Sequence, residues 1–305
     1  SGGDETEGTP PTEGGNPESG QTDLDNTTTE PGNDPDTLPN DGDISGPADD
    51  NGEDTNEPQN TDDIDDVVVP TAEEGTEENP WNISAEGDGN NVTAYLTKNT
   101  DGETYTLTLS GSGAMADYET AGTPWYEKRT SITEIVLPDG LTRIGKSAFL
   151  QTAITDVTIP DTVTSIGQNA FWNCNSIETE IPASVTELGE TAFYGTFKVT
   201  VAEDNPSYSA VGKIIYDKNK TKLIQVSQDI EGTLSIPETV EEIGAYTLYG
   251  CSSVTGELVI PDSVRTIGDA AFYGTGITSL KLGANVQTIG DNAFQGCTSL
   301  EGELT

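Results

Sequence analysis

Several residue types that commonly carry chemistry are scarce or missing in this chain. Its 305 residues include no histidine, one methionine and three cysteines. The absence of histidine excludes Ser-His-Asp and Cys-His nucleophile systems, and also the usual zinc and non-haem iron sites. These absences argue against most of the common catalytic arrangements.

Basic residues are also few. Lysine and arginine together number 12, aspartate and glutamate number 54, and the formal net charge is −42. Such a charge opposes binding to nucleic acid phosphates and to anionic lipid surfaces. No stretch is apolar and long enough for a spanning helix, and no signal segment is recognisable. We expect no nucleic acid partner and no direct membrane insertion.

Motifs for phosphate binding and acyl transfer are missing as well. The chain has neither Gly-x-x-x-x-Gly-Lys-(Ser/Thr) nor Gly-x-Ser-x-Gly. The acidic segment 62–66 does not follow the Asp-x-Asp-x-Asp-Gly pattern of calcium loops. A pair of catalytic carboxylates stays an open alternative, but such a pair needs a cleft. We expect no enzyme activity, no cofactor and no metal site.

Residues 1–80 differ in composition from the rest of the chain. They contain 25 of the 54 acidic residues and no lysine or arginine, and the first lysine is Lys98. Their only apolar cluster is Val67-Val68-Val69. A segment with so few groups to bury does not offset the entropy lost on ordering. We predict a disordered acidic tether rich in glycine, proline and threonine.

The start of the chain, Ser1-Gly2-Gly3 followed by acidic residues, resembles the segment after the lipid-bearing cysteine of bacterial lipoproteins. That cysteine is not in the sequence. A lipid anchor N-terminal to Ser1 is therefore a hypothesis, and a free, unmodified N-terminus in mass spectrometry of the native protein would exclude it.

One pattern recurs six times between residues 131 and 305. It reads Pro-x-x-(Val/Leu)-x-x-(Ile/Leu)-Gly-x-x-(Ala/Thr)-(Phe/Leu), and the last copy has Gly283 in place of proline. The glycines of successive copies are 22, 22, 55, 24 and 22 residues apart. A short period with apolar residues at fixed positions is typical of a solenoid. These repeated glycines are Gly145, Gly167, Gly189, Gly244, Gly268 and Gly290.

Each copy predicts one coil of a stack. A short alternating run, such as residues 154–159, precedes the proline and is long enough for a strand but not for a helix. Proline ends the strand because it has no N–H to donate, and we expect the glycine to supply a tight turn where a Cβ would clash. The Ala-Phe pair should point inward, and the strands should pair in a parallel ladder with a spacing of about 4.7–4.9 Å.

Residues 260–274 read Ile-Pro-Asp-Ser-Val-Arg-Thr-Ile-Gly-Asp-Ala-Ala-Phe-Tyr-Gly and closely resemble the BspA-like leucine-rich repeats of bacterial cell-surface proteins. The resemblance covers about residues 81–305. It implies a β-rich solenoid, a right-handed leucine-rich repeat stack of short strands, turns and short helical segments with an N-terminal β cap. It says less about function, because the ligands of such scaffolds depend on variable surface positions.

Residues 81–130 are predicted to form that cap. Residues 92–96 and 105–109 alternate apolar and polar side chains on either side of Thr100-Asp101-Gly102, which is typical of a β-hairpin. A solenoid needs a terminal unit to cover its first apolar coil. We therefore interpret Trp81 and Trp125 as core residues of the cap, with a binding role as the alternative.

Residues 131–305 form the repeat region, which is interrupted by an insertion at about 198–232. Residues 213–216 and 222–226 are strand-like and flank a turn-like segment, so we predict an inserted β-hairpin. We interpret this hairpin as solvated, with a recognition site as the alternative, because its surroundings hold five lysines. At the end of the chain, residues 302–305 match only the beginning of a further copy, which predicts a fragment cut within a repeat. The five lysines are Lys198, Lys213, Lys218, Lys220 and Lys222.

Cys174, Cys251 and Cys297 occupy the same position in copies that are each two coils apart. Two coil spacings, about 10 Å, exceed the ~7 Å limit between the Cα atoms of a disulfide. We predict three small buried core residues, which is compatible with an extracellular location.

Two surfaces are candidates for recognition. The strand face consists of the polar residues on the strands before the prolines; its alternative is an ordinary solvated sheet. The aromatic row consists of the residue after each Ala-Phe pair, where stacked rings could face sugars or could stiffen the coils, and we favour stiffening. The candidates on the strand face are Thr133, Asp156, Thr158, Glu257 and Lys281, and those in the aromatic row are Trp172, Tyr194, Tyr249 and Tyr273.

These observations predict an extracellular or cell-surface protein that binds other molecules without catalysis, with a lipoprotein as one form of it. The family resemblance suggests a monomer that adheres to proteins or glycans of a host or a neighbouring cell. One alternative is a carbohydrate-binding or targeting module of a larger cell-wall or glycan-active enzyme, with its catalytic domain beyond Thr305. Another is a structural surface spacer.

Overall fold

The computed structural model describes residues 74–87 and 89–301, all within one compact unit, Pro58–Thr305. The acidic tether predicted for residues 1–80 lies outside these residues up to position 73, and the partial copy predicted at 302–305 lies outside them entirely. Residues 74–80 belong to the cap, because the Leu96 N–H donates a hydrogen bond to the Gly75 carbonyl at 2.9 Å.

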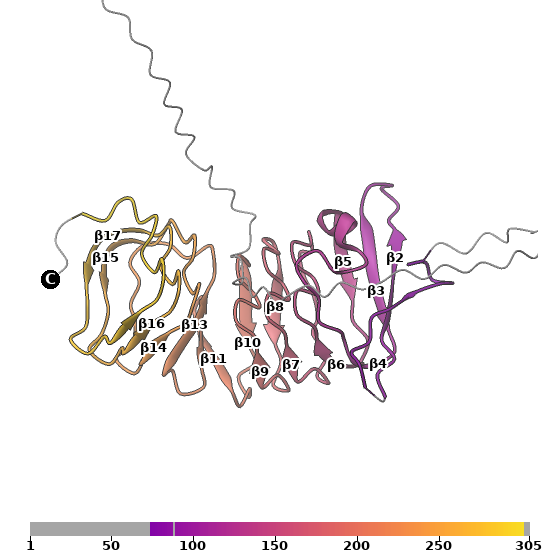
Figure 1. Cartoon of the computed structure of the whole chain (residues 1–305), viewed down its shortest axis with the longest axis horizontal. Helices are drawn as coiled ribbons and strands as arrows, with labels where there is room; N and C mark the ends of the chain where they lie inside the picture. Colours follow the sequence, from indigo (N-terminus) through magenta and orange to yellow (C-terminus); the bar gives the residue numbers. More distant parts are fainter. Residues whose placement is uncertain (1–73, 88, 302–305) are drawn as a thin grey trace, which may run out of the picture. The chain divides into compact units, whose positions relative to one another are not determined.

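The described residues wind into a β-solenoid whose coils lie side by side, from β2 and β3 at one end to β15 and β17 at the other (Figure 1). Among these residues the one helix is η1 (Tyr126–Ser131), a short 3-10 helix. The fold is the predicted leucine-rich repeat stack.

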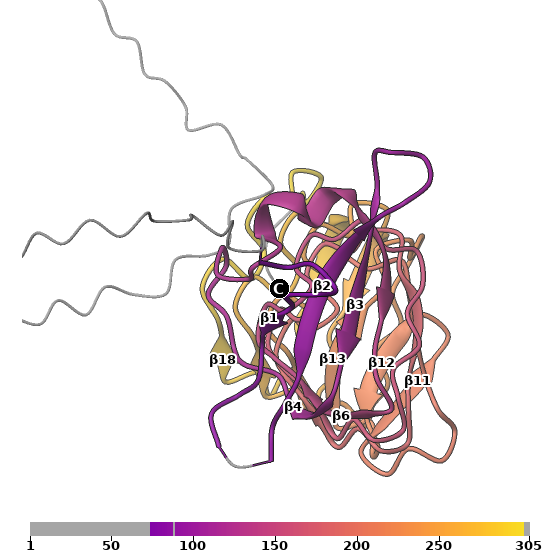
Figure 2. The same cartoon turned by 90° about the vertical axis from the view of Figure 1, so that its right-hand side faces the viewer.

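In the cap, a β-hairpin pairs with the strand of the first coil. Its sheet has the order β1-β2-β3-β5, in which β1, β2 and β3 pair antiparallel and β3 pairs parallel with β5 (Figure 2). Trp125 is buried and its indole N–H donates to the Ala148 carbonyl at 3.1 Å, so it is a core residue as predicted. Trp81 is partly buried against the same core. The strands are β1 (Trp81–Asn82), β2 (Thr93–Lys98), β3 (Tyr105–Ser110) and β5 (Ile132–Val136).

Some of the segments before the prolines form strands that pair parallel from coil to coil, as the sequence predicts. Residues 154–159 are an exception, because they form only a single bridge, between Asp156 and Glu178. β8 pairs with β10 and β15 pairs with β17. These two pairs lie on opposite sides of the insertion, and the ladder is not continuous between them. The bounds are β8 (Glu178–Ile181), β10 (Lys198–Val201), β15 (Thr255–Val259) and β17 (Gly276–Lys281).

A second ladder runs along the segments after the prolines, and the sequence did not reveal it. One sheet has the order β4-β6-β7-β9 and the next has the order β11-β12-β13-β14-β16-β18. Half of these strands are two residues long, too short for an alternating pattern. Their bounds are β4 (Ser112–Ala114), β6 (Gly140–Ile144), β7 (Ser165–Ile166), β9 (Glu187–Leu188), β11 (Tyr208–Val211), β12 (Ile214–Asp217), β13 (Lys222–Val226), β14 (Glu242–Ile243), β16 (Thr266–Ile267) and β18 (Thr288–Ile289).

The repeated glycines begin tight turns, as predicted, and allow close contact between coils. The Ala170 N–H, for example, donates to the Gly167 carbonyl at 3.3 Å. A Cβ on Gly167 would lie 2.5 Å from the backbone nitrogen of Lys146 in the preceding coil. The left-handed backbone falls two residues after each glycine, on residues of no common type. These are Ser147 (φ 54), Asn169 (φ 56), Thr191 (φ 57), Tyr246 (φ 55), Ala270 (φ 49) and Asn292 (φ 57).

The Ala-Phe pairs fill the interior, as predicted. Phe149, Phe171 and Phe193 are fully buried, and the last two stack with ring centroids 5.1 Å apart. The buried apolar residues form two clusters that divide at the insertion, between Ile215 and Tyr216.

The insertion replaces one coil with antiparallel strands. β12 and β13 pair antiparallel where the sequence predicts a hairpin, and β11 adds a third strand that the sequence did not reveal. β13 then pairs parallel with β14, so the insertion joins the ladder of the following coils.

Candidate functional site

The strand-face candidates lie on the solvent side of the coils. Asp156, Thr158, Glu257 and Lys281 are exposed, and Thr133 is half-buried. They alternate with buried apolar residues of the same strands, because successive side chains of a strand point to opposite sides. The structure therefore brings these residues onto one accessible face rather than into a pocket.

A column of acidic residues crosses this face. Asp156 faces Glu178 in the ladder, and Glu178 faces Lys198 and forms an ion pair with it at 2.9 Å. Glu134 lies 22 residues before Asp156 in the sequence, at the same position of the repeat. The sequence analysis missed Glu178, although the 22-residue spacing from Asp156 signals it.

Apolar side chains interrupt the polar strand face. Val136 on β5 is 43% exposed and Val259 on β15 is 41% exposed. Val259 lies opposite Lys281 in the parallel pair of β15 and β17. The face therefore offers hydrogen-bonding, charged and apolar contacts on adjacent strands.

The aromatic row is continuous and packed. Ring centroids are 4.0 Å apart for Trp172 and Tyr194, 5.4 Å for Tyr194 and Tyr249, and 4.4 Å for Tyr249 and Tyr273. Tyr194 and Tyr249 meet across the insertion despite their separation in the sequence. Tyr246, which the sequence analysis did not include, adds a further ring 5.9 Å from Tyr249.

Burial differs along the aromatic row. Trp172 is only 5% exposed, while Tyr194, Tyr249 and Tyr273 are half-buried. Burial also raises the pKa of Tyr194 and Tyr249 above the ordinary tyrosine value. The row therefore links the coils through ring contacts, and Trp172 has little surface left for a ligand.

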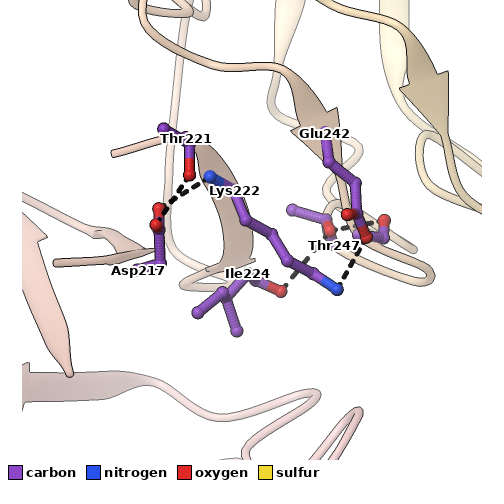
Figure 3. A network of polar contacts seen from close by, with 7 residues as sticks. Asp217, Thr221, Lys222, Ile224, Glu242 and Thr247 are labelled. Atoms are coloured by element: carbon purple, nitrogen blue, oxygen red, sulfur yellow. Dashed lines mark hydrogen bonds and ion pairs between the residues drawn. The ribbon is translucent and has the colours of Figure 1, made fainter. Parts of the chain in front are cut away.

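The insertion is less basic than its composition suggests, because its lysines have partners. Figure 3 shows Lys222 on β13 in an ion pair with Glu242 on β14 at 2.6 Å. In the same view Asp217 accepts a hydrogen bond from the Lys222 N–H at 2.6 Å, and the Thr247 hydroxyl donates to the Ile224 carbonyl at 3.4 Å. The contacts with Glu242 and Thr247 attach β13 to the next coil, and the contact with Asp217 lies within the hairpin.

Two other lysines of the insertion are also held by neighbours. Lys213 pairs with Asp229 at 2.6 Å, and Lys218 donates to the Asn205 carbonyl at 2.6 Å. Carboxylates therefore offset the charges of Lys198, Lys213 and Lys222, in agreement with a structural hairpin.

Asn205 fastens the insertion to the preceding coil. It is fully buried, and its side-chain amide donates to the carbonyls of Pro182 at 2.7 Å and Val185 at 3.0 Å. Its side-chain oxygen accepts from the N–H groups of Ser207 and Tyr208, both at 2.8 Å. All hydrogen-bonding positions of this amide are therefore used.

The cysteines are free and buried, as predicted. Burial raises the pKa of the Cys174 and Cys251 thiols to about 12. Cys174 also contacts the Thr152 hydroxyl at 3.2 Å. At neutral pH these thiols stay protonated, so they are not activated nucleophiles.

Within residues 74–87 and 89–301, no group of three or more Cys, Asp and Glu residues is placed to hold a metal ion. The same part of the chain contains no helix with the length and apolar character needed to cross a membrane.

Comparison with known proteins gives a family match. Residues 122–231 and 227–302 match the sequence profile described as BspA type Leucine rich repeat region, in 6 copies. No curated protein matches the chain.

Several solved structures are similar. One is a leucine-rich repeat protein from Eubacterium ventriosum, with 29% identity, coverage of 73% of this chain and 70% of that chain, and a TM-score of 0.46. A leucine rich cell surface protein from Faecalibacterium prausnitzii has 20% identity, coverage of 72% and 87%, and a TM-score of 0.40. The pneumococcal vaccine antigen PcpA has 15% identity, coverage of 72% and 86%, and a TM-score of 0.39.

Proposed function

Because the chain belongs to the BspA type leucine-rich repeat family, we propose that it is a non-enzymatic surface protein that binds a partner through its strand face. In this proposal the protein is a monomer, located outside the cell or on its surface, and adheres to molecules of a host or a neighbouring cell. A lipid anchor before Ser1 is one means of attachment that fits the proposal.

The observation that carries the proposal is the difference between the two candidate surfaces. Asp156, Thr158 and Glu257 are exposed, while Trp172 in the aromatic row is buried. A stack of coils exposes a broad face, and its side chains can be exchanged without disturbing the core. The strand face is therefore the surface on which recognition can vary.

A protein ligand is favoured over a glycan. The strand face combines charged groups with the exposed side chains of Val136 and Val259, a mixture typical of protein interfaces. A glycan ligand remains the second candidate because the rings of Tyr249 and Tyr273 stack 4.4 Å apart and are half-buried, which leaves part of each ring for a sugar.

Binding of the full chain to a panel of extracellular-matrix proteins and to a glycan array tests the proposal. We expect binding to at least one matrix protein, and an affinity at least tenfold lower for the triple variant Asp156→Lys, Glu257→Lys, Lys281→Glu. Such a change reverses the charges of the strand face without touching a buried side chain.

The matched control changes the net charge equally elsewhere. Lys98→Glu, Glu203→Lys and Asp204→Lys alter exposed residues of the cap and of the loop before β11. Equal losses in both triple variants, or none in either, contradict the proposal. Binding to glycans alone supports the glycan candidate, and a catalytic domain encoded beyond Thr305 supports a targeting module.

A further inference from the structure

The insertion creates a hollow between two coils. The Gln228 N–H donates to the Thr196 carbonyl at 3.3 Å, which joins the coils at that point. Beyond it, within residues 74–87 and 89–301, β10 pairs only with β8 and forms no backbone hydrogen bond with the following coil. A hollow of about 620 Å³ opens there, lined by Phe197, Val211, Lys213, Ile214, Asp229, Ile230 and Glu231.

The hollow exposes an unusual amount of apolar surface. Phe197 is 44% exposed and Val211 is 50% exposed, and Ile214 and Ile230 beside them are half-buried. The other large exposed apolar residues lie on separate strands, whereas these four line one concavity. A concave apolar surface with a few polar groups is typical of a binding site.

The charges around the hollow are unequal. Lys213 binds Asp229 through one carboxylate oxygen at 2.6 Å. The other oxygen, Oδ1, is buried and has no hydrogen-bond partner within the described residues. Glu231 is exposed at the rim, and the described ion pairs do not include it. One lysine therefore stands against two carboxylates, in a chain of net charge −42. This arrangement complements a cation.

We propose that the hollow binds a segment of a partner protein that presents a large apolar side chain next to a lysine or arginine. The apolar side chain occupies the space between Phe197, Val211 and Ile214, and the cation lies near Glu231 and Asp229. Three of the four apolar lining residues, Val211, Ile214 and Ile230, are aliphatic, which favours a peptide over a sugar. This site is distinct from the strand face, so either proposal can fail without the other.

The proposal is tested by titrating the full chain into a labelled peptide and measuring the fluorescence anisotropy of the peptide. The probe is labelled acetyl-Gly-Lys-Leu-Phe-Lys-Gly-amide, compared with the same peptide carrying glutamate for both lysines and with one carrying serine for leucine and phenylalanine. We expect saturable binding of the first probe, at least tenfold weaker binding of the other two, and weaker binding at higher salt.

Variants locate the binding. Phe197→Ser with Val211→Ser should reduce affinity for the first probe at least tenfold. Ile289→Ser, at a residue that is similarly exposed and belongs to neither proposed binding surface, should leave it unchanged. Glu231→Lys should weaken binding of the lysine probe and strengthen binding of the glutamate probe.

Three results overturn the proposal. One is the absence of saturable binding by the lysine probe. Another is an equal loss of affinity in the Phe197→Ser, Val211→Ser variant and in the Ile289→Ser variant. The third is a Glu231→Lys variant that does not change the preference between the two charged probes. Binding of chitohexaose at the hollow without peptide binding would identify a sugar site instead.

Discussion

At the scale of single residues, each repeat needs a glycine where neighbouring coils touch and a left-handed residue two positions later. The sequence shows only the first of these. The recurrence of the glycines and of the Ala-Phe pairs was visible, and so was the clash that a Cβ would cause. The left-handed residues were not visible in the sequence, because Asn169, Tyr246 and Ala270 share neither size nor polarity. Their conformation is imposed by the coil around them rather than by their own preference.

The glycine requirement differs between copies, and this gives a test. A Cβ on Gly167 would lie 2.5 Å from the Lys146 nitrogen, whereas a Cβ on Gly244 would lie 3.1 Å from its nearest neighbour, the Leu223 carbonyl. We expect Gly167→Ala to lower the free energy of unfolding by about 2–3 kcal/mol and Gly244→Ala by about 1 kcal/mol or less. Urea unfolding measures both, and equal losses would show that the contact between coils is not the cause.

At the scale of elements, the sequence predicted strands with a clear alternating pattern. It missed all the strands of two residues after the prolines, and also the longer strands β6 and β11. Two residues, as in Ser165–Ile166, contain no period, so this ladder becomes visible only when the coils are stacked. The exposure of Asp156 and Glu257 followed from alternation. The hollow could not be predicted from the sequence, because Phe197 and Ile230 are brought together by an insertion that has no repeat pattern.

The insertion depends on Asn205 for its attachment. Asn205→Ala removes the partners of two buried carbonyls and two N–H groups, so we expect the free energy of unfolding to fall by about 2–4 kcal/mol. Asn285→Ala is the control, because Asn285 is exposed and its amide donates one hydrogen bond, to Asp262, so its loss should cost less than about 1 kcal/mol. Similar losses in the two variants would refute the anchoring role of Asn205.

At the scale of the whole molecule, different residues of the described part of the chain hold the fold together and offer surfaces for binding. The phenylalanine stack and the aromatic row hold successive coils together, and the strand face and the hollow remain accessible. The sequence alone identified the solenoid because its period is regular. It could not rank the two candidate surfaces, because exposure depends on how neighbouring coils meet.

The most direct test is to display variants of the protein on cells and to measure, on the same cells, the amount of folded protein and the binding of the matrix protein. It shows whether binding and folding depend on different residues. Single substitutions are made at the strand-face positions Asp156, Glu257 and Lys281, and at the aromatic positions Trp172 and Tyr194. We predict that strand-face substitutions lower binding of the matrix protein while display of folded protein is unchanged, and that Trp172→Ala lowers both. Loss of binding at Trp172 with normal folding, together with full binding by all strand-face variants, would contradict the account.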